Sequence, residues 1–414
     1  MFKIGNYSAS DLKEKYGTPL YVYDEVQIKK NINEYKDNFK SNLYDTKIIY
    51  ASKAFSSLYM YKLVKENNIG VDVVSGGELY GVIKEGINPN DIHFHCNNKS
   101  EAEMDMAINY KVKNIIVDNF DELKIWAKKA ANINYDLYIM LRINVGVSAH
   151  THEYIVTAHP DSKFGYYIEN ADIFDSIKLI DATPNMKFMG FSTHIGSQIF
   201  DMTGFTVTIE KLFDLMKKTN REIDYLCLGG GCGVRYTDED KPLTLAEFSK
   251  IIINKVNEEI KKTNINIKEL SIEPGRSLVG NAGYQIYTIN QMKKALNKTY
   301  YFIDGGMNDN IRPALYGAIY SVDIANKIDM EKTEVVSIAG KCCESGDVLF
   351  KDVKLPKAEA NDLLVVYTTG AYGYSMASNY NRLPRPAVVF VNGKDSKLTI
   401  KRETYEDLYK NDLD

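Results

Sequence analysis

The chain has 414 residues, of which 44% are hydrophobic and 26% are charged, as is ordinary for a soluble globular protein. This length predicts two domains rather than one small core. The net charge of −4 provides no basic field for nucleic acid or an anionic membrane, so we expect a small-molecule partner, no nucleic acid and no membrane.

The location of the protein follows from what the sequence lacks. No apolar run reaches the roughly 18 residues that span a bilayer, and the N-terminus lacks a signal-type pattern, so we expect a cytoplasmic protein. The five cysteines form no disulfide framework, because their number is odd and two of them are adjacent.

Residues 1–27 contain one strand signal, at 19–23, with no partner nearby in the sequence, so we expect it to pair with a distant segment. From residue 28 to 283, short β-branched or aromatic runs alternate with amphipathic segments such as 120–131 and 245–262. We count eight strands, the number that closes a parallel (β/α)8 TIM-type barrel. The expected strand ends are 50–53, 71–75, 93–95, 116–119, 141–144, 191–194, 226–229 and 271–274.

After residue 284 the helical periodicity gives way to strand-like runs separated by turn signals. This pattern predicts a C-terminal β-sandwich or β-barrel-like domain, residues 284–414, that also takes the N-terminal strand of 1–27. The expected strands are 284–289, 299–304, 335–338, 363–367, 387–391 and 397–400.

Reactive side chains gather at the predicted strand ends, where the active site of such a barrel lies. An apolar run places Lys53 at the first of these ends, among neighbours that we expect to keep it dry. A desolvated lysine is neutral more often and attacks an aldehyde to form a Schiff base; alternatively, Lys53 extends to solvent. The others are Asp72, His95, Arg142, His194, the Gly229 cluster, Glu273 and Arg276.

Three of these strand ends indicate a cofactor. The glycines at 229–231 form either a phosphate-binding turn or a plain tight turn. Glu273 and Arg276 form either a local ion pair or a site where a carboxylate keeps a pyridine nitrogen protonated. Together with Lys53, these features describe pyridoxal phosphate.

Other groups carry less specific signals. His194 is either catalytic or structural. We expect no metal: the group His150, His152 and His159 is better explained as a polar loop. In the second domain, Arg312 offers a two-pronged grip for a carboxylate, and Cys343 offers a thiol beside a carboxylate, or else a buried turn cysteine.

At this point the sequence resembles the diaminopimelate decarboxylases, in the wider group of pyridoxal-phosphate enzymes that includes ornithine and arginine decarboxylases. The resemblance runs over nearly the whole chain, and the last four motifs are the ones most specific to the diaminopimelate branch. The motifs are YASKA at 50–54, VDVVSGGEL at 71–79, FHCNNKS at 94–100, HIGSQ at 194–198, GGG at 229–231, EPGR at 273–276, GMND at 306–309, RPALY at 312–316, CESGD at 343–347 and AYG at 371–373.

The resemblance implies a role for each matching residue. Lys53 would hold the cofactor covalently, with Asp72 beside it, His194 stacked on the ring and Glu273 at the ring nitrogen. Ser197, Gly230, Gly231, Arg276 and Tyr372 would hold the phosphate side. Arg276, Arg312 and Tyr316 would bind the substrate's far carboxylate, Glu344 would bind its far ammonium, and Tyr372 would also contact the substrate. The second domain would in this way complete the active site and the dimer interface. Cys343 would come from the second subunit of a homodimer with shared active sites and protonate the carbanion.

The sequence departs from the family pattern at four positions. Ser52 and Phe55 stand where the family more often has valine and asparagine. Cys342 replaces a usual aliphatic residue, and Val145 a frequent proline. Phe55 and Cys342 leave the choice of substrate open.

The function expected from this resemblance is decarboxylation of meso-2,6-diaminopimelate to L-lysine and carbon dioxide, the last step of lysine biosynthesis. The first alternative is a decarboxylase of the same fold that acts on D-ornithine, D-lysine, carboxynorspermidine or a carrier-tethered substrate. A racemase fits less well, because Glu273 favours a full electron sink. A non-catalytic pyridoxal-phosphate carrier would lack the second domain.

Overall fold

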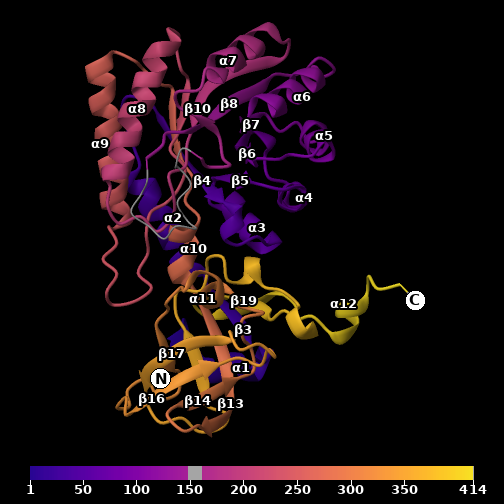
Figure 1. Ribbon diagram of the computed structural model, residues 1–414, viewed down its shortest axis with the longest axis vertical. Helices are drawn as coiled ribbons and strands as arrows, with labels where there is room; N and C mark the ends of the chain where they lie inside the picture. The colour runs from indigo at the N-terminus through magenta and orange to yellow at the C-terminus, as the bar shows by residue number, and fades with distance from the viewer. Residues whose placement is uncertain (148–160, 414) are drawn as a thin grey trace. The chain divides into compact units, whose positions relative to one another are not determined.

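The computed structural model describes residues 1–147 and 161–413, which form two compact units (Figure 1). The barrel unit consists of Asn31–Gly233 and Pro242–Ser277, and the β unit of Met1–Lys30, Val234–Lys241 and Leu278 to the end of the described chain. The segment 234–241, which the sequence placed in the barrel, belongs to the β unit because Val234 and Tyr236 are buried in its hydrophobic core.

The barrel unit contains a closed, all-parallel sheet of eight strands, as predicted. Closure follows from the pairing of β10 with β8 and of β12 with β4. A short extra strand, β9 (Tyr166–Tyr167), pairs with β8 outside the ring. The ring consists of β4 (Asp45–Ala51), β5 (Gly70–Val73), β6 (Ile92–Phe94), β7 (Asn114–Val117), β8 (Leu137–Asn144), β10 (Met186–Ser192), β11 (Tyr225–Cys227) and β12 (Glu269–Ile272).

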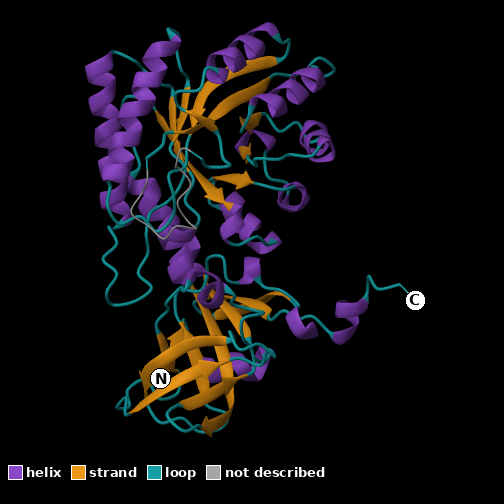
Figure 2. Ribbon diagram, in the orientation of Figure 1, coloured by secondary structure: helices purple, strands orange, loops and turns teal. Residues whose placement is uncertain are grey.

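Helices follow the strands and lie outside them (Figure 2). Their starts are fixed by side-chain caps: Ser100 and Thr244 form capping boxes at α5 and α9. The amphipathic patterns at 120–131 and 245–262 are confirmed as helices. The helices are α2 (Glu25–Asn38), α3 (Leu58–Glu66), α4 (Gly76–Glu85), α5 (Glu101–Asn109), α6 (Phe120–Ala130), α7 (Asp172–Ala182), α8 (Thr203–Thr219), α9 (Leu245–Thr263) and α10 (Arg276–Val279).

The β unit is a mixed sheet with the order β17-β16-β14-β13-β3-β19-β20, to which β18 and β15 are joined. The expected capture of the N-terminal strand is confirmed, because β3 pairs antiparallel with β13 and parallel with β19. The strands are β1 (Lys3–Ile4), β2 (Tyr7–Ser8), β3 (Leu20–Asp24), β13 (Gly283–Lys294), β14 (Thr299–Ile303), β15 (Val322–Ile324), β16 (Glu334–Ala339), β17 (Val348–Leu355), β18 (Leu363–Val366), β19 (Ala387–Asn392) and β20 (Asp395–Ile400).

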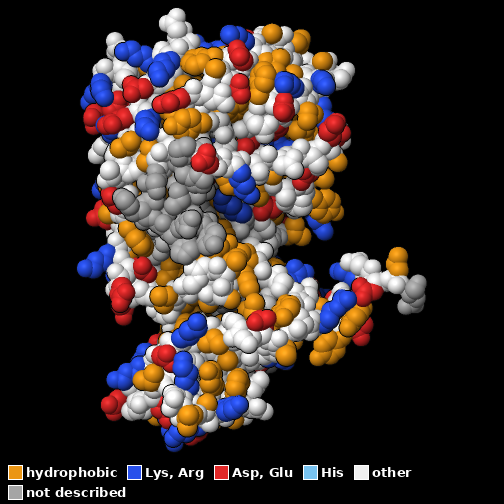
Figure 3. Space-filling view, viewed as in Figure 1, with side chains coloured by type: hydrophobic (Ala, Val, Ile, Leu, Met, Phe, Trp, Pro, Cys, Tyr) orange, Lys and Arg blue, Asp and Glu red, His pale blue; other side chains and the backbone are white. Residues whose placement is uncertain are grey.

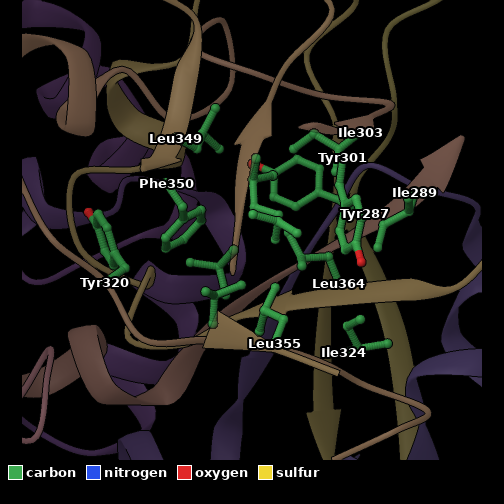
Figure 4. Packing of buried hydrophobic residues seen from close by; sticks show 14 of the residues in the cluster. Tyr287, Ile289, Tyr301, Ile303, Tyr320, Ile324, Leu349, Phe350, Leu355 and Leu364 are labelled. Carbon is green, nitrogen blue, oxygen red and sulfur yellow. The ribbon is translucent and has the colours of Figure 1, made fainter. Parts of the chain in front are cut away.

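The core of the β unit is rich in aromatic and branched side chains that pack between its strands, including Tyr287, Tyr301, Phe350 and Leu364 (Figure 4). Four of its strands were not predicted: the two-residue strands β1 and β2, and β15 and β17. β15 has only three residues, and β17 carries exposed lysines and turns at Asp352, where φ is +53°. Its helices are short: α1 (Ala9–Tyr16), α11 (Arg312–Tyr316) and α12 (Tyr405–Tyr409).

Charged side chains of both signs are spread over the face seen in Figure 3. Within the described residues, no helix combines the length and the hydropathy that crossing a bilayer requires.

A buried ion pair joins the loop between β6 and α5 to α6 in the barrel unit. Lys99 Nζ lies 2.8 Å from Glu122 Oε1, and the two side chains are 0% and 5% exposed. The ammonium also donates to the carbonyl oxygens of Cys96 and Ile116, so all three of its protons are used.

Replacing Lys99 with methionine should lower the free energy of unfolding by about 3–5 kcal/mol, because it leaves the Glu122 carboxylate buried without its partner. Urea unfolding measures this loss. The control is Lys124→Met, which breaks an exposed pair with Asp121 and should cost less than about 1 kcal/mol. Similar small losses in both variants would contradict the prediction.

Candidate active site

The carboxyl ends of the eight strands meet at one mouth of the barrel, because all of them run in the same direction. The structure therefore brings together the reactive side chains that the sequence singled out in this unit. They are Lys53 after β4, Asp72 in β5, His95 after β6, Arg142 in β8, His194 after β10 and Glu273 after β12.

Lys53 lies in a short 3-10 turn, Ser52–Ala54, directly after β4. The expectation that its neighbours keep it dry is wrong: the side chain is exposed, while Ser52 and Ala54 are buried. Glu78 holds the turn in place, because its Oε2 accepts from Ser52 Oγ at 2.7 Å and from the backbone N–H of Val74 at 2.8 Å. The turn thus presents an amine at a fixed position on the mouth.

Glu273 is a buried carboxylate with an imidazole partner. His95 Nε2 lies 2.7 Å from Glu273 Oε1, and the ring nitrogen is the donor, since a carboxylate only accepts. Burial by itself would raise the pKa of Glu273, but the imidazoles of His95 and His93 together outweigh it and hold the pKa well below its ordinary value. Glu273 therefore remains ionised and can balance a cation brought to it.

Two further buried groups surround this pair. Burial raises the pKa of Asp72 against the opposing charge of His95, and burial lowers the pKa of His93. Asp72 Oδ1 and His93 Nδ1 make no hydrogen bond among the described residues. Ligand atoms of His93, His95 and Glu273 lie within 4.8 Å of one another, a spacing that also suits a metal ion.

His194 follows β10 and is partly buried. Burial lowers its pKa well below the ordinary value, and the nearby charges of Lys53 and Arg142 lower it further. The imidazole is therefore neutral at neutral pH, and its flat face suits packing against an aromatic ring.

The three glycines after β11 allow this segment to approach the neighbouring strand ends closely. A Cβ on Gly229 would lie 2.5 Å from the Thr193 carbonyl oxygen, and one on Gly230 would lie 2.3 Å from that of Glu273. Nearby, Arg276 donates from Nε and Nη2 to Ser197 Oγ, at 3.2 and 2.9 Å. A buried guanidinium, a hydroxyl and a glycine turn are groups that bind phosphate.

In the β unit, Arg312 is a buried cation surrounded by tyrosines. Its Nη1 donates to Tyr320 Oη at 2.7 Å and to Tyr236 Oη at 3.3 Å, and its guanidinium lies 5.9 Å from the Tyr316 ring and 5.8 Å from the Tyr372 ring. Among the described residues no carboxylate forms an ion pair with it. A buried charge is costly unless it is paired, so this arrangement is suited to receive an anion.

Tyr372 occupies a constrained loop of the same unit. Its φ is +64°, an uncommon value for a bulky residue. The loop is tied to β3, because Tyr23 Oη donates to the Gly370 carbonyl oxygen at 2.8 Å. Tyr21 from the same strand donates to the Asp309 carbonyl oxygen at 2.6 Å. The captured N-terminal strand therefore supports two of the motifs.

The two adjacent cysteines differ. Cys342 is buried, and burial raises the pKa of its thiol to about 12, whereas Cys343 and Glu344 are exposed. Asp347 fixes the turn by accepting from the backbone N–H groups of Cys342 at 2.8 Å and Met307 at 2.7 Å. Cys343 is therefore the solvent-exposed thiol of the pair.

Asp309, in the β unit, is a fully buried carboxyl. Its Oδ1 accepts from Tyr287 Oη at 2.7 Å, while Oδ2 has no hydrogen-bond partner in the described part of the chain. Burial raises the pKa of this carboxyl to about 7, although the Tyr287 hydrogen bond opposes the shift.

The site residues thus fall into two clusters, one in each unit. The sequence missed Glu78 as the anchor of the lysine turn, His93 as a neighbour of Glu273, and Tyr236 and Tyr320 as partners of Arg312. The EL pair at 78–79 after two glycines was the one signal for Glu78; the tyrosines carried none. His150, His152 and His159 lie outside the described residues.

A family model supplies the class of protein. The pyridoxal binding domain of the pyridoxal-dependent decarboxylases matches residues 26–280, and the chain belongs to this family. Its relatives are diaminopimelate decarboxylases. That of Bacillus subtilis (strain 168) is 47% identical, over 99% of this chain and 95% of its own length, and that of Bacillus methanolicus is 46% identical, over 97% and 94%.

Solved structures agree with this assignment. A diaminopimelate decarboxylase from M. jannaschii in complex with L-lysine superposes with a TM-score of 0.92 at 36% identity, covering 98% of this chain and 94% of its own. A lysine/ornithine decarboxylase from Vibrio vulnificus shares the fold, with a TM-score of 0.77 at 20% identity over 93% and 97%.

The Asp309 carboxyl gives a pH-dependent prediction. Its pKa in the folded protein, about 7, is higher than the ordinary 3.8, so the folded state binds more protons and loses stability as the pH rises from about 4 through about 7. Asp309→Asn removes this titration. Its free energy of unfolding relative to the native chain should rise between pH 5 and pH 8 by on the order of 2–4 kcal/mol in urea unfolding. The exposed Asp121→Asn should show no such rise; a flat profile for Asp309→Asn would contradict the prediction.

Proposed function

We propose that this enzyme decarboxylates meso-2,6-diaminopimelate at its D-configured centre, giving L-lysine and carbon dioxide with pyridoxal phosphate as cofactor. The observation that carries the proposal is the buried Arg312 without a carboxylate partner among the described residues, since a substrate with a second carboxylate supplies the missing anion. The family membership and the relatives support the same reaction.

The residues at the barrel mouth fit the cofactor. An exposed amine can react with its aldehyde, an ionised buried carboxylate can pair with a protonated ring nitrogen, and a guanidinium with a hydroxyl can bind its phosphate. The cofactor, when bound, supplies an electron sink for the bonding pair left by carbon dioxide. In this proposal Lys53, Glu273 and Arg276 perform these three roles, in that order.

The other barrel residues orient the cofactor. His194 packs its neutral ring on the pyridine, and Asp72 lies near the amine of Lys53. Ser197, Gly230 and Gly231 complete the phosphate side with backbone N–H groups and the Ser197 hydroxyl. Glu78 keeps the lysine turn in position through Ser52.

The β unit recognises the far end of the substrate. Arg312 pairs with the distal carboxylate, with Tyr316 and Tyr372 around it, and Glu344 pairs with the distal ammonium. A site built for charged groups rejects analogues that lack them by several orders of magnitude. Substrates with one carboxylate leave Arg312 unpaired, so they are turned over poorly.

Cys343 delivers the proton that replaces the lost carboxylate. In this proposal the thiol belongs to the second subunit of a homodimer, so each active site is shared and a monomer is inactive. The exposure of Cys343 in the single chain is compatible with this role, because the thiol is available to a partner.

The first experiment is to saturate the purified protein with pyridoxal phosphate and to follow carbon dioxide release from meso-, LL- and DD-diaminopimelate and from D- and L-ornithine and lysine. The expected result is release from the meso isomer with L-lysine as product. Faster turnover of ornithine or D-lysine would favour the alternative decarboxylases of this fold. Cofactor binding without any turnover would favour a carrier.

Arg312→Met should reduce kcat/KM for meso-diaminopimelate by about 10²- to 10³-fold, because about 3–4 kcal/mol of charge-assisted contact is lost. Cofactor affinity should change less than about threefold, since the proposed contacts of Arg312 are to the substrate.

The matched control is Arg382→Met, which removes another ring-stacked arginine, over Tyr409, but an exposed one. This variant should retain its kcat/KM. Equal losses of cofactor affinity and turnover in Arg312→Met would count against the assignment.

A further inference from the structure

Strand β6 and the residue that follows it supply two buried imidazoles to the barrel unit, His93 and His95. His93 and His95 are separated by two positions, so their side chains point to the same face of the strand. Their exposed fractions are 3% and 6%. The proposed function uses neither of them directly.

Both imidazoles are directed at the same carboxylate oxygen. His95 Nε2 lies 2.7 Å from Glu273 Oε1, and His93 Nδ1 lies 3.7 Å from that atom. The shorter distance is a hydrogen bond and the longer one is not. Glu273 thus has one donor in place and a second within about 1 Å of hydrogen-bond distance.

The His93 ring nitrogen lacks any other partner in the described residues. An orphaned buried polar atom is costly and requires an explanation. If His93 only filled the core, an apolar side chain of similar size would avoid this cost. Its position beside Glu273 places the nitrogen near a carboxylate oxygen that can accept a hydrogen bond from it.

We propose that His93 is a positioning residue for Glu273: its Nδ1–H becomes a hydrogen-bond donor to Oε1 when the carboxylate engages its ligand. This inference rests on the proposed function, in which that ligand is the protonated ring nitrogen of pyridoxal phosphate. A carboxylate with two imidazole donors stays ionised and keeps its orientation, whereas one donor leaves it free to rotate.

The other titratable groups that act on Glu273 do not replace this role. They are Asp72, His95, His194 and Cys227, from four further positions around the barrel mouth. Burial keeps the Asp72 carboxyl and the Cys227 thiol protonated to higher pH than usual, and His194 is neutral. The two β6 imidazoles are therefore the groups that set the charge and direction of Glu273.

The test compares His93→Asn with His93→Leu in the full-length enzyme. An asparagine amide N–H occupies nearly the place of Nδ1–H, whereas leucine has similar bulk and no donor. Thr208→Val serves as the control, because it removes a different buried polar atom without a hydrogen-bond partner among the described residues, the hydroxyl of Thr208 in α8. Three properties are measured for each: the dissociation constant of pyridoxal phosphate, the pH dependence of the bound cofactor's absorbance, and the midpoint of thermal unfolding without cofactor.

We expect His93→Leu to weaken pyridoxal phosphate binding about tenfold and to move the absorbance transition toward lower pH, because the ring nitrogen loses its proton more readily. His93→Asn should restore both properties to within about threefold of the native values. Thr208→Val should change neither. The midpoint of thermal unfolding identifies a purely structural role for His93, because such a role would lower the midpoint without moving the absorbance transition.

The inference is overturned if His93→Leu binds and titrates like the native enzyme, or if His93→Asn is as impaired as His93→Leu. Failure of the proposed function has a different signature: the native protein itself would not bind pyridoxal phosphate.

Discussion

The hydrogen bond between His95 and Glu273 is the interaction on which the barrel site depends. Burial inside the barrel would by itself raise the pKa of this carboxyl and favour its protonated form. His95 supplies the opposing charge at 2.7 Å, and the carboxylate remains ionised as a result. Burial is the main cause at the three surrounding groups: it raises the pKa of Asp72 and lowers the pKa values of His93 and His194. At Glu273, by contrast, the neighbouring imidazoles outweigh burial.

The β unit solves the opposite problem, since it buries a cation without an anion. Hydroxyls and rings of tyrosines around Arg312 provide partial negative charge but no full counter-charge. Burying this charge without a counter-ion lowers the stability of the free protein, and binding of an anion would offset that loss. The two units thus differ in the charge that they bury: the barrel unit holds the Glu273 carboxylate, and the β unit holds the Arg312 guanidinium, which is suited to an anionic ligand.

Much of this could be predicted from the sequence, because the relevant signals are local. All eight barrel strands, the strand-end positions of Lys53, Asp72, His95, His194 and Glu273, and the capture of β3 were found from periodicity and turn residues. What failed depended on contacts between distant segments. The exposure of Lys53 is set by the turn that Glu78 holds, and Tyr236 reaches Arg312 from a segment that the sequence assigned to the other unit.

The place of β3 between β13 and β19 has a consequence for synthesis of the chain. Its apolar residues are synthesised before either partner strand, since β13 begins at Gly283 and β19 only at Ala387. The barrel strands are complete by Ile272, so the barrel can form while the β unit still lacks every strand from β13 to β20. A chain interrupted before β19 would carry a finished barrel and an uncovered edge of β3, which is a ready template for aggregation. The backbone of β3 is therefore covered on both edges only once β13 and β19 have both been synthesised.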